Sequence, residues 1–307
     1  MKTVSLPKSV NIVEVGPRDG LQNETRPIPL DEKLAFVHAL ADAGLKQIEA
    51  TSFVHPKAVP QLADALELAQ QLPSRDGVTW SALAPNAKGL DRAIEAGIKR
   101  IAVFTAASET FTSKNIRMTI SESLKVFEEM IPRAIDAGMS VRGYVSTAFV
   151  CPYEGDIEPQ KVVGVSKELI DLGVDEVAIS DTIGAASPRD VRAVLDLAIP
   201  ACSSQRLALH FHDTYGTALA NVYAGLEAGI STFDASAGGL GGCPYAPGAS
   251  GNLATEDLVY FLDRMGIACG VSLEGVADAA RKIMQHLDPR PSSRQMARLD
   301  AGSRDCH

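Results

Sequence analysis

The sequence predicts an α/β fold, a (β/α)8 TIM barrel with an additional C-terminal helix and a short polar tail. Three observations support this prediction: short apolar runs alternate with amphipathic segments eight times, a glycine-containing junction recurs between them, and no domain linker interrupts the 307 residues. A chain of this length is either two average domains or one large barrel. We expect one domain over 1–307, with the barrel at about 8–268 and the C-terminal helix and tail at about 269–307.

The recurring junction consists of a small or aliphatic residue, Gly, an apolar residue, and then a β-type run. Glycine suits the end of a helix, where a positive φ disfavours a side chain. The run that follows each junction is short and apolar, as expected for a strand that is buried on both faces. Five junctions follow this pattern: Ala43-Gly44-Leu45, Ala96-Gly97-Ile98, Ala137-Gly138-Met139, Leu172-Gly173-Val174 and Ala228-Gly229-Ile230.

Eight strands and eight helices follow from these junctions. The strands are expected near 11–15, 47–52, 78–83, 100–106, 141–147, 176–181, 207–213 and 232–237. The helices are expected near 31–42, 57–71, 86–95, 119–137, 159–171, 188–199, 217–227 and 252–264, with a further helix at 270–287. Strict alternation favours a closed barrel over an open doubly wound sheet, which is the alternative. In a barrel, chemistry belongs at the carboxyl ends of the strands.

Composition limits the classes of partner and the compartment. The formal net charge of −9 argues against nucleic acid or an anionic membrane as partner. We find no run of about 18 apolar residues, so a membrane span is not expected. Five scattered cysteines do not form a disulfide framework, and the N-terminus has no secretory or mitochondrial leader pattern. A cytoplasmic protein is the resulting expectation.

His210-Phe211-His212 ends the seventh predicted strand and is followed by Asp213. Residues i and i+2 of a strand share a face, so both imidazoles can point into the barrel mouth as metal ligands. Two hydrogen-bonded core histidines are the simpler interpretation, and this motif alone does not decide between them.

The first strand runs into Gly16-Pro17-Arg18-Asp19-Gly20, which places a cation beside a carboxylate in a turn. Asp19 would bind a metal and Arg18 would face a developing anion; a surface ion pair is the alternative. Asp181 ends the sixth strand, and Glu14 and Glu49 lie within apolar strands, where a carboxylate needs a partner. For these three acids a structural role competes equally with catalysis.

The segment 237–252 is rich in glycine and carries Cys243. It is too long for a simple connector, which favours a mobile lid that carries a thiol over a flexible loop with an incidental cysteine. Asn252 stands where this loop enters the last barrel helix. It can cap that helix or offer a carbonyl oxygen to a metal. Asp19, His210, His212 and Asn252 together would supply two oxygens and two nitrogens, a set suited to Mg²⁺ or Mn²⁺.

Three segments closely resemble the 3-hydroxy-3-methylglutaryl-CoA lyase family: 13–24, 210–216 and 239–252. The Arg-Asp and His-x-His motifs are shared by a wider superfamily, and the Gly-Leu-Gly-Gly-Cys-Pro-Tyr loop narrows the resemblance to the lyases. The resemblance covers roughly 8–290. It implies a (β/α)8 barrel and a small-molecule acyl-CoA substrate, with a homo-oligomer, most commonly a dimer, as the assembly.

The resemblance also implies a role for each site residue. Asp19, His210, His212 and Asn252 would hold a divalent cation, Mg²⁺ or Mn²⁺. Arg18 would stabilise enolate charge and, with Gln22, contact the substrate. Cys243 would transfer a proton, and Glu49 and Asp181 would line the site. The expected reaction is a retro-Claisen cleavage of 3-hydroxy-3-methylglutaryl-CoA to acetyl-CoA and acetoacetate.

Three alternatives stay open at the level of sequence. A lyase for a longer-branched 3-hydroxyglutaryl-CoA homologue is compatible with the sequence. A related metal-dependent acyltransferase or aldolase would use the same barrel without the thiol loop. A catalytically silent binding barrel would be expected to have lost metal ligands or the loop, and neither is lost here.

Overall fold

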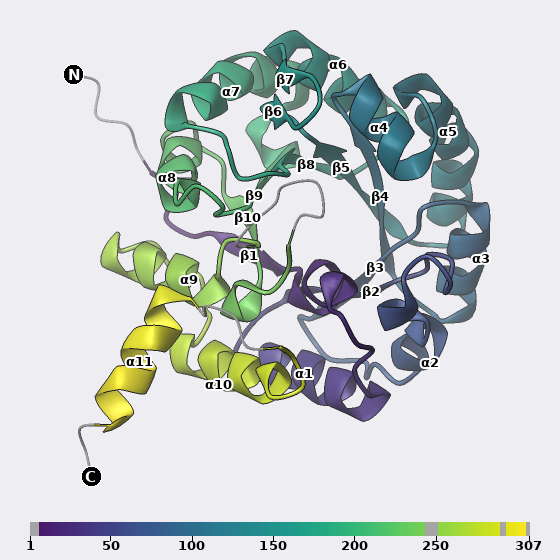
Figure 1. The fold of residues 1–307 in the computed structure, drawn as a ribbon. Coiled ribbons are helices and arrows are strands. Elements are labelled where there is room, and N and C mark those ends of the chain that lie inside the picture. The colour runs from purple at the N-terminus through teal and green to yellow at the C-terminus, as the bar shows by residue number, and fades with distance from the viewer. Residues whose placement is uncertain (1–5, 243–250, 289–292, 305–307) are drawn as a thin grey trace.

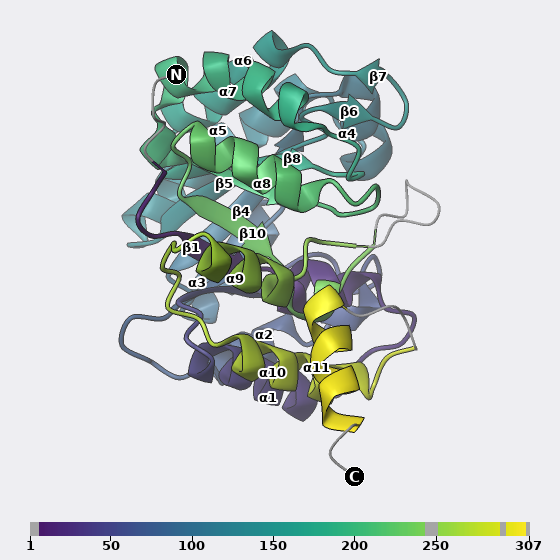
Figure 2. The same ribbon diagram turned by 90° about the vertical axis from the view of Figure 1, so that its left-hand side faces the viewer.

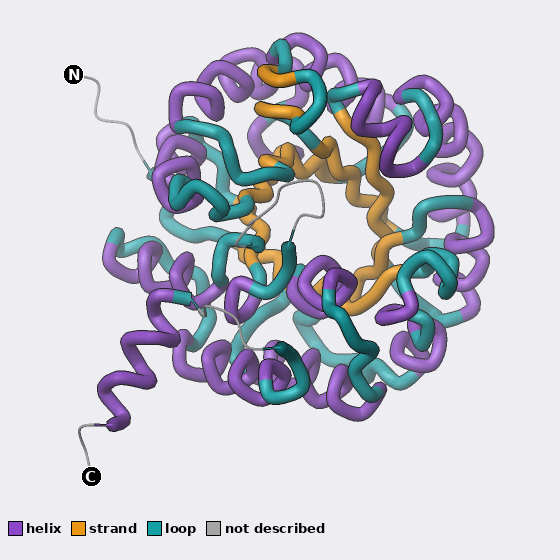
Figure 3. Tube along the Cα trace, viewed as in Figure 1, coloured by secondary structure: helices purple, strands orange, loops and turns teal. Residues whose placement is uncertain are grey.

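The computed structural model describes residues 6–242, 251–288 and 293–304 (Figure 1). Eight parallel strands close into a barrel in the order β1-β10-β9-β8-β5-β4-β3-β2, which confirms the predicted fold class. The barrel strands are β1 (Asn11–Glu14), β2 (Gln47–Ser52), β3 (Thr79–Leu83), β4 (Arg100–Ala106), β5 (Ser140–Ser146), β8 (Glu176–Asp181), β9 (Leu207–Phe211) and β10 (Thr232–Ala235). They form the inner ring of the molecule, and the helices surround them (Figure 3).

The five glycine junctions have the predicted conformation. Gly44, Gly97, Gly138, Gly173 and Gly229 all have positive φ, between 75° and 106°. Each ends a helix and turns the chain back toward the next strand, because the left-handed backbone there is nearly free of cost only for glycine. The repeat read from the sequence is therefore the repeat of the barrel itself.

The outer helices agree with prediction except in the second βα unit and before the fifth helix. The helices are α1 (Leu30–Asp42), α2 (Ala65–Gln70), α3 (Ala87–Glu95), α4 (Glu109–Ile116), α5 (Ile120–Asp136), α6 (Pro159–Asp171), α7 (Pro188–Cys202), α8 (Ala218–Glu227) and α9 (Thr255–Arg264). The predicted helix at 57–71 starts only at Ala65, after a short turn that begins at Pro60. Asp64 just before it accepts hydrogen bonds from the buried Lys33 at 2.7 and 3.0 Å, which holds this segment as a loop.

Two small elements were not predicted. Helix α4 is capped by Ser108, whose side chain accepts a hydrogen bond from the Phe111 amide at 3.1 Å. The strands β6 (Val150–Cys151) and β7 (Gly155–Asp156) form an antiparallel pair in the loop after β5. Glu154 in the turn between them accepts a hydrogen bond from the Thr110 amide at 2.7 Å, so this hairpin is fastened to the start of α4.

The C-terminal region contains the expected extra helix and one more. Helix α10 (Leu273–Met284) packs against α1 and α9 and completes the outer ring (Figures 1 and 2). The polar segment that follows residue 288 was expected only as a tail, but it includes α11 (Arg294–Arg304). Asp257 of α9 accepts hydrogen bonds from the first amides of α11, at 3.2 Å from Arg294 and 2.8 Å from Gln295. Ser293 also accepts a hydrogen bond from the Met296 amide at 3.0 Å, a local N-cap that was not recognised in the sequence.

The buried core has two parts, one outside the barrel strands and one inside them. The larger part fills the space between strands and helices. A small inner cluster lies inside the barrel and is formed by Leu83, Ala102, Tyr144, Ala178 and Ala208. Above it, polar side chains gather at the carboxyl ends of the strands, where a barrel of this class places its site. Within the described ranges, no helix has the length and apolar character needed to cross a membrane.

Candidate metal centre and substrate cavity

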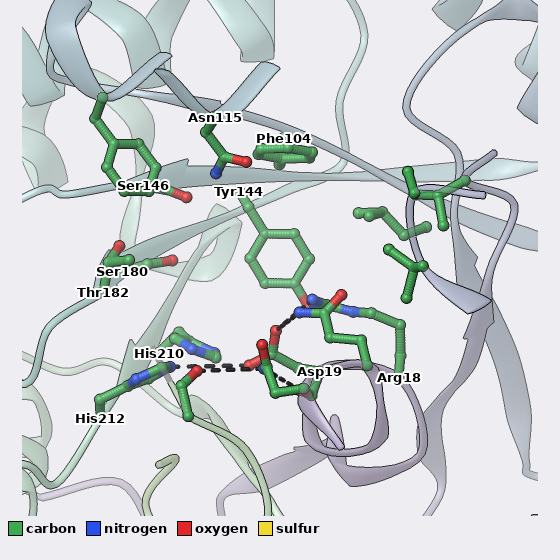
Figure 4. Close-up of a pocket in the computed structure, with 18 residues that line it drawn as sticks. Arg18, Asp19, Phe104, Asn115, Tyr144, Ser146, Ser180, Thr182, His210 and His212 are labelled. Atoms are coloured by element: carbon green, nitrogen blue, oxygen red, sulfur yellow. Dashed lines mark hydrogen bonds and ion pairs between the residues drawn. The ribbon is translucent and has the colours of Figure 1, made fainter. Parts of the chain in front are cut away.

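The chain leaves β1 through one wide turn, Gly16–Gly20. The carbonyl oxygen of Val15 accepts hydrogen bonds from three successive amides, at 3.1 Å from Arg18, 2.7 Å from Asp19 and 3.3 Å from Gly20. Such π-helical turns are rare and are frequent at functional sites. The turn carries the side chains of Arg18 and Asp19 at the barrel mouth (Figure 4), where both residues are buried. The alternative interpretation, an ion pair on the protein surface, is therefore excluded.

Three side chains hold Asp19 in place. Its Oδ1 atom accepts hydrogen bonds from Arg18 Nη1 at 2.6 Å and from Gln22 Nε2 at 2.7 Å. Its Oδ2 atom accepts one from Asn252 Nδ2 at 3.0 Å. Burial by itself raises the pKa of Asp19, but the Arg18 charge, together with His212 and His210, lowers that pKa well below its usual range. Asp19 is therefore a carboxylate at neutral pH.

The two histidines face Asp19 (Figure 4) from the end of β9, which β10 separates from β1 in the barrel. His210 lies in β9 and His212 follows it, so that the two rings share a face with centroids 5.2 Å apart. One potential ligand atom from each of Asp19, His210 and His212 lies within 4.8 Å of the others. Burial lowers the pKa of His212 despite the nearby Asp19 carboxylate, which raises it; the result favours the neutral imidazole that metals bind.

Asn252 joins this group from the far side of the glycine-rich loop. It pairs with His212 in an isolated antiparallel bridge, and its Nδ2 atom also donates to the Leu240 carbonyl at 3.0 Å. Nδ2 thus donates to two acceptors, Asp19 Oδ2 and the Leu240 carbonyl, and these fix the amide with Oδ1 pointing away from both. Gly241 makes this placement possible, because a Cβ there would lie 2.6 Å from Asn252 Nδ2.

The donor set has an unsatisfied atom that fits a cation. Asn252 Oδ1 is buried and has no hydrogen-bond partner among the described residues. Buried polar atoms are normally paired, so this one indicates a missing partner. A carboxylate, an amide oxygen and two imidazoles are suitable ligands for Mg²⁺ or Mn²⁺. The residues present therefore fit a divalent cation.

Arg18 is fixed beside the carboxylate group. Its Nη1 atom donates to Asp19, and its Nε atom donates to Glu49, a buried residue of β2. Burial opposes the charge of Arg18, but Glu49 and Asp19 raise its pKa well above the ordinary value. Glu49 also accepts a hydrogen bond from the Tyr144 hydroxyl at 2.6 Å. The structure thus places Glu49 behind Arg18, where it orients the guanidinium, and not on the cavity wall.

Asp181 ends β8 as predicted, but its carboxylate turns back into its own loop. Its two oxygens accept hydrogen bonds from the amides of Ala185 and Ala186, both at 3.0 Å. Burial raises the pKa of Asp181 to about 6. Its neighbours Ser180 and Thr182, which the sequence analysis did not single out, line the cavity in its place.

A cavity of about 420 Å³ opens beside the metal ligands. Its polar side includes Arg18, Asp19, Gln22, His210 and His212, so that five predicted residues meet at one surface. The apolar part of its lining is formed largely by Val54, Val59, Leu83, Phe104 and Phe111. Gly242 also lines it. Cys243, the predicted thiol, lies outside the described residues.

The sequence analysis missed three polar residues beneath the site. Arg142 donates to both oxygens of Asp234, at 2.7 and 3.0 Å, and to the Tyr144 hydroxyl at 2.8 Å. Asp234 in turn contacts His210 Nδ1 at 3.1 Å. Arg142 and Asp234 are charged residues within apolar strands, the same signal that drew attention to Glu49.

Comparison with known proteins agrees with this geometry. Residues 9–283 match the model of the HMGL-like family. The bovine mitochondrial hydroxymethylglutaryl-CoA lyase is 50% identical over 290 residues, which cover 94% of this chain and 89% of the relative. A 3-hydroxy-3-isohexenylglutaryl-CoA/hydroxy-methylglutaryl-CoA lyase of Pseudomonas aeruginosa is 47% identical, with coverage of 95% and 97%.

A solved structure shows the same fold. The crystal structure of a hydroxymethylglutaryl-CoA lyase from Pseudomonas aeruginosa aligns with a TM-score of 0.94 at 47% identity, and the alignment covers 97% of this chain and 99% of that one. Both the sequence match and the structural match cover nearly the whole chain. The chain therefore belongs to the HMGL-like family, with hydroxymethylglutaryl-CoA lyases as relatives over nearly its whole length.

Proposed function

We propose that this protein cleaves 3-hydroxy-3-methylglutaryl-CoA to acetyl-CoA and acetoacetate, with a divalent cation, Mg²⁺ or Mn²⁺, as cofactor. One observation carries the proposal: Asp19, His210 and His212 come from distant parts of the chain and offer ligand atoms within 4.8 Å of one another beside a fixed arginine. The relatives named above support the substrate.

The cation would be held by Asp19, His210, His212 and the free Oδ1 atom of Asn252. When bound, such an ion supplies Lewis acidity to the substrate's 3-hydroxyl and so eases its deprotonation. The remaining requirements fall on the chain's own side chains, because a retro-Claisen cleavage needs a base, a stabilised enolate and a proton donor.

Bond changes in the cleavage are simple to balance. A base takes the proton of the 3-hydroxyl, the C3–O bond becomes the ketone of acetoacetate, and the C2–C3 bond breaks. Its electron pair stays on C2, which gives the enolate of acetyl-CoA, and C2 then takes one proton. Arg18 is placed to stabilise the enolate, because its guanidinium is charged, buried and held by two carboxylates before the substrate arrives.

For proton transfer we propose Cys243, with His210 and an aspartate as competitors for the role of base. Gly242 lines the cavity immediately before this cysteine in the chain, which supports a thiol that reaches the enolate carbon. Arg18 nearby would lower the pKa of such a thiol, since a positive charge favours the thiolate. Glu49 and Asp181 have positioning roles in this proposal, and Gln22 contacts the substrate beside Asp19.

A second candidate substrate is a glutaryl-CoA with a longer branch at C3. The apolar side of the cavity favours it, because Val54, Leu83 and Phe104 offer a surface larger than one methyl group requires. A relative at 47% identity carries both activities in its name. No comparable observation favours the acyltransferase or aldolase alternative.

One assay separates these functions. The purified chain is incubated with 3-hydroxy-3-methylglutaryl-CoA and Mg²⁺, without a second substrate, while acetoacetate and acetyl-CoA are measured; chelation by EDTA is the control. The proposal predicts both products in equal amounts and their loss with EDTA. An acyltransferase would release no acetoacetate. The same assay with longer-branched substrates tests the second candidate.

We also propose that residues 1–307 act as one domain, that two copies form a homodimer, and that the protein works in the cytoplasm. The family resemblance and the scattered cysteines support these expectations. Light scattering of the purified protein is expected to give twice the mass of 32.5 kDa. Cell fractionation checks the compartment, and a single unfolding transition is expected for one domain.

A further inference from the structure

His210 and Asp234 lie side by side in the barrel wall. They are register partners on the parallel strands β9 and β10, so backbone pairing brings their side chains together on the inner face. His210 Nδ1 lies 3.1 Å from Asp234 Oδ2. The side chain of Asp234 is fully buried, and that of His210 is 7% exposed.

Asp234 has little freedom to move or rotate. Arg142 of β5 holds both of its oxygens, with Nη2 to Oδ1 at 2.7 Å and Nη1 to Oδ2 at 3.0 Å. This two-point contact fixes a carboxylate in its plane. Arg142 is itself held by Glu176, which accepts from Nε at 2.8 Å, and by the Tyr144 hydroxyl at 2.8 Å. The contact on His210 is therefore anchored through three barrel strands.

A held carboxylate determines which ring nitrogen carries the proton. An ionised carboxylate only accepts hydrogen bonds, so His210 contributes the proton from Nδ1 and keeps its lone pair on Nε2. His212 differs, because its Nδ1 is buried without a partner within the described part of the chain, while its Nε2 lies 3.8 Å from Asp19 Oδ2. The two histidines are thus oriented by different means.

We propose that Asp234, held by Arg142, is a positioning residue that keeps His210 in its Nδ1–H form and leaves Nε2 ready to bind the divalent cation. This inference rests on the metal site of the proposed function and deepens it. The competing view is that Arg142 and Asp234 form a structural ion pair whose contact with the histidine has no effect on metal binding.

Asp234→Asn distinguishes the two views. The amide has the shape of the carboxylate but no charge. Arg142 Nη1 and His210 Nδ1 meet the same atom of Asp234, so this place is taken either by the amide oxygen, a weaker neutral acceptor, or by the NH₂ group, which moves the proton of His210 to Nε2. Both arrangements weaken the hold on the Nδ1–H form. We expect Mn²⁺ affinity, measured by electron paramagnetic resonance of the free ion without substrate, to fall about 10–100-fold.

Glu176→Gln is the matched control. Like Asp234→Asn, it removes a negatively charged partner of Arg142, but Glu176 has no contact with His210 among the described residues. We expect its Mn²⁺ affinity to stay within about twofold of the wild type, since the imidazole keeps its partner. Equal losses in both variants would overturn the inference, and so would an unchanged affinity in Asp234→Asn.

Removing one charge of a buried pair can prevent folding, so two further measurements are needed. The double variant Asp234→Asn/Arg142→Gln leaves no uncompensated charge and is expected to lose Mn²⁺ affinity as well; wild-type affinity would overturn the inference. In the metal-free wild type, ¹⁵N NMR of labelled histidine is expected to show His210 protonated at Nδ1. A signal from the Nε2–H form would equally overturn it.

The outcome for the wild type separates this inference from the proposed function. If the wild type binds no Mn²⁺ or releases no acetoacetate, the proposed function fails. If it binds Mn²⁺ and cleaves the substrate while Asp234→Asn binds the ion equally well, only the role of Asp234 fails.

Discussion

The side-chain amide of Asn252 donates a hydrogen bond to Asp19 at 3.0 Å, although 233 residues separate the two in the chain. Asp19 leaves the first strand of the barrel, and Asn252 enters the last barrel helix. Their contact closes the rim at the point where the barrel itself closes. It also leaves Asn252 Oδ1 buried without a partner within the described residues.

Asn252→Ala tests this closure. The change removes both the free oxygen and the support for Asp19, so we expect Mn²⁺ affinity to fall at least about tenfold. Asn86→Ala is the control: Asn86 caps α3 by accepting from the Gly89 amide at 3.0 Å, and its loss costs about 1 kcal/mol of stability without affecting metal binding. Isothermal titration with Mn²⁺ checks both variants. Equal affinities in Asn252→Ala and the wild type would count against ligation by Asn252.

Arg18→Gln is expected to damage turnover more than metal binding. Loss of a preorganised charge at a developing enolate typically costs about 10²–10³ in kcat. Initial rates of acetoacetate release, compared with Mn²⁺ affinity, check this prediction. Arg26→Gln serves as the matched control, because Arg26 lies in the same segment but is exposed and pairs only with Asp288 at 3.1 Å among the contacts described. A loss of metal affinity as large as the loss of rate would instead make Arg18 a support for Asp19.

Cys243→Ala is expected to lose most turnover while Mn²⁺ affinity stays nearly intact, because the role proposed for the thiol is proton transfer and not metal binding. Cys269→Ala, at a partly exposed cysteine distant in sequence, is expected to keep wild-type activity. Steady-state rates and Mn²⁺ titration of both variants are the measurements. Parallel loss of rate and affinity in Cys243→Ala would show that the loop acts structurally.

Phe104→Ala tests the apolar side of the cavity. Removing the ring lets a larger C3 branch fit and weakens contacts to a methyl branch. We expect the ratio of kcat/KM for a longer-branched substrate to that for the methyl substrate to rise about tenfold or more. Measured kcat/KM values for the two substrates provide the ratio. An unchanged ratio would place the branch away from Phe104.

Stability is expected to fall as pH rises toward 8. Burial raises the pKa of Glu14 to about 7 and that of Glu256 to about 8, from an ordinary 4.5. The unfolded chain releases these protons near pH 4.5, so above that pH the folded protein binds more protons than the unfolded chain does. The free energy of unfolding therefore decreases between about pH 4.5 and 8.

Glu256→Gln removes one of these titrations. The neutral side chain can still accept a hydrogen bond from the Gly238 amide, which contacts Glu256 at 2.9 and 3.0 Å. We expect this variant to be more stable than the wild type at pH 8 by about 1–3 kcal/mol and nearly equal at pH 5. Urea unfolding at both pH values checks it. Glu122→Gln should keep the wild-type slope from pH 6 to 8, because hydrogen bonds from Thr119 lower the pKa of Glu122. A wild-type slope in Glu256→Gln would contradict the prediction.

Residue patterns sufficed for the barrel because its unit repeats. Gly44 and Gly229, which both have positive φ, belong to a junction motif of a few consecutive residues that can be recognised in the sequence. Helix α11 was not predicted although Ser293 is a local N-cap, because the helix is also held by Asp257, a residue far away in the sequence that accepts from two of its first amides. The predicted start of the second helix, at residue 57, was wrong for a similar reason. The ion pair between Lys33 of α1 and Asp64 holds the residues before α2 as a loop.

The same distinction holds for the site: positions at strand ends were predictable from the sequence, and the directions of the side chains were not. Asp19 and His210 stand at strand ends, where the active site of a barrel lies, and the structure brings their ligand atoms together in the candidate metal centre. Glu49 and Asp181 were also found, but the direction of their carboxylates depends on partners that no pattern reveals. Asp234 was not predicted as a site residue because its proposed role depends on its register with His210 on the adjacent strand.

Anomalous X-ray diffraction at the manganese edge, on crystals of the full chain soaked in Mn²⁺, locates the cation without reliance on activity. The proposed centre predicts one strong peak per chain within bonding distance of Asp19, His210, His212 and Asn252. A peak elsewhere, or a saturated crystal with no density between those four side chains, would show that they do not share an ion.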